Sequence, residues 1–357
     1  MPPADDARTA GPGGGTGGAP PSIALSPILA ARYRSRDLDR IREAAPGARL
    51  ITLSVEGLAD APLQDVEVLL RGWLSADAFD RLLARAPRLR WVHSASAGVE
   101  RALTPAARER GIVITNARGV FSRPIAEYVL MMILAVSRRL PQLLELQRER
   151  TWQPLEGAEL RDVTVGIVGL GSIGREVAGL ASAFGCRVIA TRRRAAAGAA
   201  GPVELGGDGA AGPGEPTLDR VMGPDGLPEL LGESDFVVLA APLTPETEGI
   251  IGAQALADMK PGSWLINVAR GRLVDERALL RALHEGPMGG AVLDTFVDEP
   301  LPPGSPFYDL PNVIVTPHTS WSSGRVLDRS VELFCDNLRR YAAGEPLLNV
   351  VNPNAGY

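Results

Sequence analysis

The segment at 163–191 contains the feature that most limits how this chain can fold. An apolar run, VTVGIVGL, leads directly into glycines at Gly169, Gly171 and Gly174, and a helical pattern and a second apolar run, CRVIAT, follow. A strand, a glycine turn, a helix and a strand in this order form the βαβ unit that binds dinucleotides. The glycine spacing is weak evidence by itself, but this context makes it specific.

Each glycine has a separate role in such a unit. Gly169 permits the tight turn, Gly171 lets the backbone approach a pyrophosphate, and Gly174 lets the helix pack closely on the sheet. The helix N-terminus offers the N–H groups of Ser172 and Ile173 to the phosphates. These five residues are therefore expected to bind the cofactor.

Apolar runs alternate with helical patterns on both sides of this unit. Residues 23–115 contain three apolar runs, ARLITLSVE, LRWVHSAS and IVITNA, and the runs DFVVLAA, SWLINVA, GGAVLDTF and VIVTPH follow the glycine turn. Such alternation predicts the α/β class with two Rossmann-like, doubly wound parallel sheets. Residues 122–140 are apolar nearly all round a helix, so we expect this helix to be buried between domains or subunits.

The two series divide the chain into domains. We expect residues 122–318 to form the dinucleotide-binding domain, and residues 23–121 with 319–357 to form the substrate domain, because the closing helical segment can return to the first series. Residues 1–22 and about 195–218 are rich in glycine, alanine and proline and have little to bury. They are predicted to be a disordered tail and a flexible insertion.

Composition and charge exclude several classes of protein. The 357 residues are 45% hydrophobic, with a net charge of -5 and a pI near 5.5, which argues against a general nucleic-acid or anionic-membrane binder. No stretch approaches the ~20 apolar residues of a membrane span, and the first residues lack the apolar core of a signal, so a cytoplasmic location is expected. Cys186 and Cys335 lie in apolar surroundings without metal-ligand spacing. We expect inert thiols and no metal site.

The strand after the glycine helix ends in three arginines, Arg192-Arg193-Arg194. A site for NAD normally has an aspartate or glutamate here to bind the ribose 2′-hydroxyl, whereas arginine pairs with the 2′-phosphate of NADP. Because the acidic residue is absent and Arg192 and Arg193 are present, we expect NADP(H) to be preferred over NAD(H). A solvated basic turn is the alternative interpretation.

Three residues with complementary chemistry stand downstream, in the order Arg270, Glu299, His318. Each ends a predicted strand or lies in the turn after it, in INVARG, DTFVDEP and VIVTPH. In an open parallel sheet such positions converge on one crevice. A histidine transfers protons near neutral pH, a carboxylate beside it fixes the tautomer, and an arginine binds a carboxylate through two parallel hydrogen bonds. The set predicts hydride transfer to or from a small 2-keto or 2-hydroxy acid.

Together these segments resemble the D-isomer-specific 2-hydroxyacid dehydrogenases, from about Leu50 to Tyr357. The segments that carry the resemblance are SASAGVE at 94–100, AEYVL at 126–130, VGIVGLGSIG at 165–174, APLTPETEGII at 241–251, MKPGSWLINVARGRLVDERAL at 259–279, AVLDTFVDEPL at 291–301 and TPH at 316–318. The resemblance implies a cofactor domain inserted into a discontinuous substrate domain, and a homodimer formed through the inserted domain.

The resemblance also implies roles for individual residues. Arg270 is implied to bind the substrate carboxylate and carbonyl, His318 to be the acid/base, and Glu299 to be its partner. Asp294 is implied to face the nicotinamide amide. The remaining implied contacts are Ala241, Pro242 and Val268 in the cofactor pocket, and the backbone amides of Ala97, Gly98 and Val99 as a second clamp on the substrate carboxylate.

Reduction of a 2-keto acid such as glyoxylate or hydroxypyruvate is the expected working direction, because cells keep NADP largely reduced. Three other functions share parts of this sequence pattern. A formate dehydrogenase-like reaction is disfavoured, since those relatives pair the active histidine with glutamine where Glu299 stands here. Phosphoglycerate dehydrogenase-like activity is an alternative, although no regulatory domain follows the closing helical segment. A cofactor-sensing binding protein, like the C-terminal-binding corepressors, is the non-enzymatic alternative.

Three further residues have structural explanations. Trp321 follows TPH where many relatives have a glycine-containing turn, and either lining the substrate pocket or packing between domains would explain it. His93 ends a predicted strand, and a hydrogen-bonded core position is favoured over a contact with substrate. His284 ends a helical pattern, where a cation interacts favourably with the helix dipole.

Overall fold

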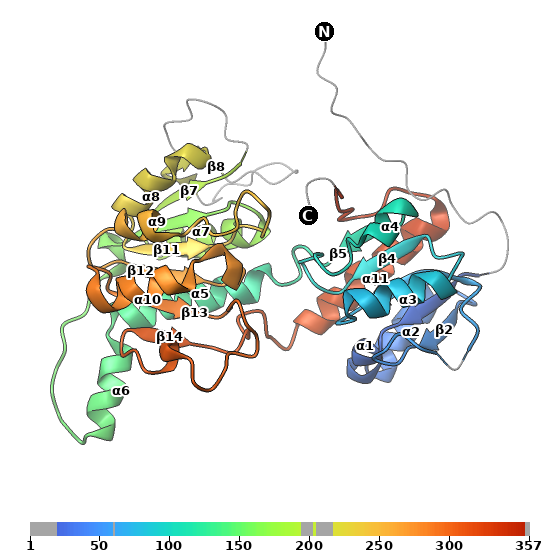
Figure 1. Ribbon diagram of the computed structural model, residues 1–357, viewed down its shortest axis with the longest axis horizontal. Coiled ribbons are helices and arrows are strands. Elements are labelled where there is room, and N and C mark those ends of the chain that lie inside the picture. The colour runs from blue at the N-terminus through green and yellow to red at the C-terminus, as the bar shows by residue number, and fades with distance from the viewer. Residues whose placement is uncertain (1–19, 60, 194–202, 205–216, 354–357) are drawn as a thin grey trace, which may run out of the picture. The chain divides into compact units, whose positions relative to one another are not determined.

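The computed structural model describes residues 20–59, 61–193, 203–204 and 217–353. Two compact units make up the chain, one within Phe121–Ser322 and the other within Met1–Val120 and Ser323–Tyr357 (Figure 1). The predicted tail at 1–22 and insertion at 195–218 lie outside the described residues, except for 20–22 and two short antiparallel strands, β8 (Val203–Glu204) and β9 (Thr217–Leu218).

The unit built from both chain ends contains a five-stranded parallel sheet in the order β2-β1-β3-β4-β5. Helices α3 and α4 cover one face of this sheet, and α2 and α11 cover the other. Its elements are β1 (Ser22–Leu25), α1 (Pro27–Arg32), α2 (Ser35–Ala44), β2 (Arg49–Thr52), β3 (Val66–Arg71), α3 (Ala76–Arg85), β4 (Trp91–Ser94), α4 (Pro105–Glu109), β5 (Val113–Asn116) and α11 (Val326–Ala343).

The second unit contains a seven-stranded parallel sheet in the order β10-β7-β6-β11-β12-β13-β14. Helices α5 and α7 pack on one face, and α8, α9 and α10 pack on the other. Its elements are α5 (Ser122–Ser137), α6 (Leu140–Arg148), β6 (Thr164–Val168), α7 (Ser172–Ala183), β7 (Arg187–Thr191), β10 (Arg220–Met222), α8 (Leu227–Glu233), β11 (Phe236–Leu239), α9 (Ala253–Ala257), β12 (Trp264–Asn267), α10 (Glu276–Glu285), β13 (Gly290–Leu293) and β14 (Val313–Val315).

These two sheets confirm the predicted α/β class with two doubly wound parallel domains. Strands β1 and β3 were not expected from the sequence, because both lack the alternation of a half-buried strand and are mostly buried. The helix predicted at 122–140 is α5, which ends at Ser137, and a second helix that was not predicted, α6, begins at Leu140. Arg139 has the left-handed φ of 53° between them, and Pro141 stands in the first turn of α6, where a helix can begin but not continue.

Strand β6 stands at the point where the order of the second sheet reverses. β7 and β10 lie on one side of it, and β11 to β14 lie on the other. In open α/β sheets, ligands bind at the carboxyl ends of the strands near such a point. Within the described part of the chain, no helix is both long enough and apolar enough to cross a bilayer.

Candidate active site

The glycine turn joins β6 to α7 at the centre of the sheet. Gly169 has φ +101°, and a Cβ there would lie 2.6 Å from the backbone nitrogen of Ala241. A Cβ on Gly174 would overlap the carbonyl oxygen of Gly169, because α7 packs directly against the turn. Both positions therefore require glycine. A Cβ on Gly171, in contrast, would meet no atom within 4 Å.

The open space beside Gly171 lies at the N-terminus of α7. The first N–H groups of a helix have no carbonyl partner within it, so those of Ser172 and Ile173 can bind an anion. The positive end of the helix dipole favours the same charge. Free space and backbone donors together fit the pyrophosphate of a dinucleotide.

Arg192 and Arg193 directly follow β7, the strand beside β6, and both are exposed. A hydrogen bond from Thr244 and, to a smaller extent, the charge of Arg193 lower the pKa of Glu246. Glu246 lies in the loop after β11, so Arg193 and this loop flank the glycine turn from either side. The basic residues thus stand where the adenosine end of a bound dinucleotide is expected.

The residues implied to line the cofactor pocket follow β11 and β12. Ala241 and Val268 are buried, and the Thr247 hydroxyl donates to the Pro242 carbonyl at 2.7 Å, which fixes the loop after β11. All three residues lie at the same edge of the sheet as the glycine turn. Their contact with cofactor stays a prediction.

Arg270 follows β12 and is held by its neighbours. The Asn267 side-chain amide donates to the Arg270 carbonyl at 2.9 Å, and its oxygen accepts the Ala269 N–H at 3.1 Å. A Cβ on Gly271 would overlap the backbone of Phe296, so the turn after Arg270 packs directly on the segment that follows β13. Close backbone packing therefore sets the position of the arginine relative to the next loop.

Glu299 and His318 form a hydrogen-bonded pair. His318 Nδ1 lies 2.8 Å from Glu299 Oε2, and the other carboxylate oxygen accepts the Phe296 N–H at 3.0 Å. Because the carboxylate engages Nδ1, the Nε2 atom of the imidazole is left for substrate. The His318 and Glu299 side chains are 41% and 37% exposed, so a ligand can reach them.

The charge state of this pair follows from its surroundings. Partial burial acts to raise the pKa of Glu299, but hydrogen bonds from His318 and Phe296 outweigh it, and the charges of His318 and Arg270 add to their effect. The pKa of Glu299 therefore lies below its ordinary value, and the carboxylate is ionised at neutral pH. The turn after Arg270 packs on the backbone of Phe296, whose N–H donates to Glu299, so the arginine follows a loop that lies beside the pair. Arg270, Glu299 and His318 thus come together in one unit.

Asp294, at the end of β13, anchors the loop that carries His318. The buried carboxylate accepts the Thr316 hydroxyl at 2.6 Å and the N–H groups of Thr319 and Ser320 at 2.8 and 3.0 Å. The Tyr128 hydroxyl of α5 lies 2.6 Å from the Thr316 hydroxyl. Asp294 therefore positions the loop in this structure, and its contact with the nicotinamide amide stays a prediction.

The residues predicted to form a second substrate clamp, 97–99, follow β4. The carbonyls of Ala97 and Gly98 accept hydrogen bonds from Asn116 at 2.8 Å and from the Ser96 hydroxyl at 2.7 Å. Within the described part of the chain, the N–H groups of Ala97, Gly98 and Val99 donate to no backbone carbonyl. These groups are available to a carboxylate, but their role stays a prediction.

The other histidines lie apart from this chemistry. His93 is fully buried, its Nδ1 lies 2.8 Å from the Thr115 hydroxyl, and burial lowers its pKa to about 3, so it is a neutral core residue. His284 is exposed in the last turn of α10. Cys186 and Cys335 are buried free thiols. Among the residues that the structure describes, no three His, Cys, Asp or Glu side chains gather as a metal ion would require.

Three residues that position the site were not identified from the sequence. Asn267 stands three positions before Arg270, at the end of an apolar run. An asparagine at this place is a local signal for a side chain that bonds the backbone of the following turn. Tyr128 and Thr316 are 188 positions apart, and no local pattern connects them. Only the packing of α5 beneath the His318 loop brings them together.

Comparison with known proteins assigns the family. The model of the D-isomer specific 2-hydroxyacid dehydrogenase, NAD binding domain, matches residues 130–320. The chain therefore belongs to the D-isomer specific 2-hydroxyacid dehydrogenase family, which confirms the resemblance seen in the sequence. It is an oxidoreductase that acts on the CH–OH group of a 2-hydroxy acid with a nicotinamide cofactor.

Individual relatives show how far the likeness extends. A glyoxylate reductase of Korarchaeum cryptofilum is 32% identical over 88% of this chain and 90% of that protein. A D-3-phosphoglycerate dehydrogenase of Mycobacterium bovis is 36% identical over 84% of this chain, which spans only 53% of that protein. A solved NADPH-dependent glyoxylate/hydroxypyruvate reductase from Sinorhizobium meliloti, in complex with NADP and sulfate, is 28% identical with a TM-score of 0.77, covering 95% of this chain and 100% of that one.

Gly171→Ala tests whether the open space beside Gly171 receives the phosphates of the cofactor. The added methyl group meets no protein atom within 4 Å, and the φ of −85° suits alanine. The free energy of unfolding should therefore stay within about 0.5 kcal/mol of the wild-type value. Because the methyl group fills the space that a pyrophosphate must approach, the Kd of NADPH should rise roughly tenfold or more in a fluorescence titration.

Gly304→Ala is the matched control, since its Cβ also meets nothing within 4 Å. This variant should bind NADPH as the wild type does. Equal NADPH affinity in the two variants would show that the space beside Gly171 is not the phosphate site.

Proposed function

We propose that this protein reduces a small 2-keto acid, of the glyoxylate or hydroxypyruvate type, to the D-2-hydroxy acid with NADPH. The observation that carries the proposal is the His318–Glu299 hydrogen bond of 2.8 Å, with the charge of Arg270 close enough to affect the carboxylate. An acid/base beside a permanent cation is the chemistry that this reduction needs. The names of the relatives from Korarchaeum and Sinorhizobium support this substrate class.

The proposed mechanism assigns one task to each of these side chains. Arg270 binds the substrate carboxylate and stabilises negative charge on the carbonyl oxygen as it becomes an alkoxide. His318 donates a proton from Nε2 to that oxygen, while Glu299 holds the proton on Nδ1 and stabilises the imidazolium form. The N–H groups of 97–99 are further donors for the carboxylate. When held by the glycine turn and the N-terminus of α7, NADPH would supply a hydride to the carbonyl carbon.

NADP(H) is the proposed cofactor. Arg192 and Arg193 are exposed at the end of β7 and offer two guanidinium groups to a 2′-phosphate. The sequence directly after β7 has no aspartate or glutamate, which an NAD site has there for the 2′-hydroxyl. The bound NADP of the Sinorhizobium relative supports the same choice. Asp294, Ala241, Pro242 and Val268 are proposed to contact the nicotinamide half.

A substrate panel with the purified full chain tests the function. We expect turnover of glyoxylate or hydroxypyruvate with NADPH, and a fall in kcat/KM of roughly 10³-fold in His318→Ala and in Arg270→Ala. The Kd of NADPH should change little, because neither side chain is proposed to hold the nucleotide. His284→Ala and Arg277→Ala, at exposed positions of α10, are the matched controls and should keep wild-type activity.

The same panel separates the alternatives. It includes 3-phosphohydroxypyruvate, because the Mycobacterium relative is a phosphoglycerate dehydrogenase. Preferred turnover of that compound would replace the proposed substrate class. NADPH binding without turnover of any 2-keto acid would favour a cofactor-sensing protein instead.

The double variant Arg192→Ala/Arg193→Ala tests the cofactor proposal. Removing both guanidinium groups should lower kcat/KM for NADPH by roughly 10- to 100-fold and leave the value for NADH nearly unchanged, since only NADPH carries the 2′-phosphate. Arg277→Ala/Arg281→Ala removes two exposed arginines of the same unit and should change neither value. Equal wild-type turnover with the two cofactors would remove the basis of the preference.

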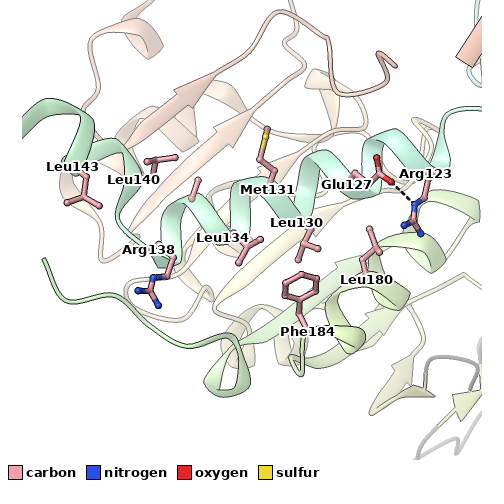
Figure 2. A pocket seen from close by; sticks show the side chains of 11 residues that line it. Arg123, Glu127, Leu130, Met131, Leu134, Arg138, Leu140, Leu143, Leu180 and Phe184 are labelled. Carbon is pink, nitrogen blue, oxygen red and sulfur yellow. Dashed lines mark hydrogen bonds and ion pairs between the residues drawn. The ribbon is translucent and has the colours of Figure 1, made fainter. Parts of the chain in front are cut away.

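A homodimer formed through the cofactor unit is also proposed. An apolar groove with a volume of about 610 Å³ runs along α5. Figure 2 shows Arg123, Glu127 and Arg138 among the side chains that line it. Met131 of α5 and Phe184 after α7 are 51% and 49% exposed in it. None of the residues of α6 is buried, although Leu140, Leu143 and Leu144 project from it. Large apolar side chains on one continuous surface need a partner surface, and we propose a second copy of this chain.

Met131→Glu tests the dimer by light scattering coupled to gel filtration. A charge in the middle of the groove should convert a wild-type dimer into a monomer, because an unpaired carboxylate would be buried at the interface. Val55→Glu, at an apolar residue 61% exposed in the other unit, is the matched control and should remain dimeric. A monomeric wild type, or a dimeric Met131→Glu, would exclude this interface.

Location and other partners complete the proposal. Two buried free thiols suit a reducing compartment, and we propose that the protein is cytoplasmic. The net charge of -5 gives no support to nucleic-acid binding.

A further inference from the structure

The backbone at His318 has a conformation that a histidine does not favour. Its φ is +48°, in the left-handed region, which residues with a Cβ adopt only rarely. The adjoining turn is tight, because the His318 N–H donates to the Thr316 carbonyl at 3.0 Å. Such a backbone persists only where its surroundings hold it, so the contacts of residues 316–321 decide where the imidazole lies.

Two separate anchors hold this loop. Asp294 fixes Thr316, Thr319 and Ser320 through the three hydrogen bonds described above, and none of these involves His318 itself. Trp321 contacts the histidine directly, since its indole Nε1–H donates to the His318 carbonyl at 2.7 Å. The His318 carbonyl and the Thr319 N–H belong to one peptide unit, so the indole holds the carbonyl end of this unit and Asp294 holds its N–H end.

The indole ring of Trp321 is held by contacts with other apolar side chains of the cofactor unit. It meets the Phe121 ring edge-on, with 6.2 Å between the ring centroids and 86° between the planes, and it packs against the apolar core under α5. Phe121 is the N-cap residue of α5. The chain passes from one unit to the other at Val120–Phe121 and at Ser322–Ser323. Phe121 and Trp321 lie in the cofactor unit, next to these two boundaries, so the contact between their rings joins the two segments at which the chain enters and leaves this unit.

We propose that Trp321 is a positioning residue for His318. Its ring rests on Phe121 and its N–H holds the His318 carbonyl, which keeps the imidazole directed at Glu299 and at the substrate carbonyl. Trp321 acts through the backbone of the histidine and does not bind the substrate side chain. This inference rests on the proposed reductase function, in which His318 transfers the proton.

Trp321→Phe tests the inference kinetically in the full chain with NADPH. The substitution keeps an aromatic ring and removes the N–H donor. We expect kcat to fall roughly tenfold or more, because small misplacements of an acid/base are costly, while the KM of the 2-keto acid and the Kd of NADPH stay within about twofold. The isotope effect with 4-deuterated NADPH should rise, as the chemical step becomes slower than product release.

Trp264→Phe is the matched control for loss of packing. Trp264 packs on the same core as Trp321, and it begins β12, at the edge of the sheet opposite to the one from which the His318 loop emerges. This variant should be less stable and keep its kcat. Equal losses of kcat in Trp321→Phe and Trp264→Phe would mean that Trp321 acts only through packing, and would overturn the proposal. A large rise in KM with kcat unchanged would mean that Trp321 contacts the substrate, and would also overturn the proposal.

A spectroscopic measurement separates this inference from the reductase function. The chain has three histidines, so the imidazole signals of ¹⁵N-histidine-labelled protein are few, and His318→Asn identifies one of them. Trp321→Phe should shift or abolish the low-field Nδ1–H signal of the His318–Glu299 hydrogen bond and leave the His284 signal unchanged. An unchanged Nδ1–H signal would contradict the positioning role even if no 2-keto acid were turned over.

Discussion

Parallel pairing of the strands in the cofactor unit is the constraint on which the site depends. Because β6, β7 and β11 to β14 all run in one direction, every loop that follows a strand emerges at the same edge of the sheet. The glycine turn, the basic turn after β7 and the loops that carry Arg270, Glu299 and His318 are neighbours for this reason. The hydrogen bonds of the backbone thus collect, at one edge, residues that lie far apart in the sequence.

Buried polar groups then give each loop a single conformation. Asn267 fixes the turn before Arg270, and the fully buried Asp294 accepts three hydrogen bonds from the His318 loop. These three hydrogen bonds hold the loop around the left-handed backbone of His318. A substitution of Asp294 would disturb the acid/base together with any contact to nicotinamide. Loss of activity in such a variant would therefore not assign the cofactor contact.

Sequence reasoning succeeded where a residue's role is local. The glycine spacing, the α/β alternation and the polar residues after strands are short patterns, and they predicted the fold class and the neighbourhood of Arg270, Glu299 and His318. It failed where a role depends on distant packing, as for Tyr128 with Thr316. It also extended the helix at 122–140 past its observed end at Ser137, because the left-handed backbone of Arg139 has no signal in the apolar pattern. The role proposed for Trp321 could not be predicted for the same reason, because its partner Phe121 lies far away in the sequence, at the first residue of the cofactor unit.

Helix α5 contacts the His318 loop and also lines the apolar groove. One side of it supports the His318 loop, through Phe121 beneath Trp321 and through Tyr128 at Thr316. Another side carries Met131 in the apolar groove that we propose a second copy covers (Figure 2). A packed helix transmits displacement along its length instead of absorbing it. Covering the groove would therefore also restrain the loop that holds the acid/base, so the proposed dimer would stabilise the geometry of the site without contributing a residue to it.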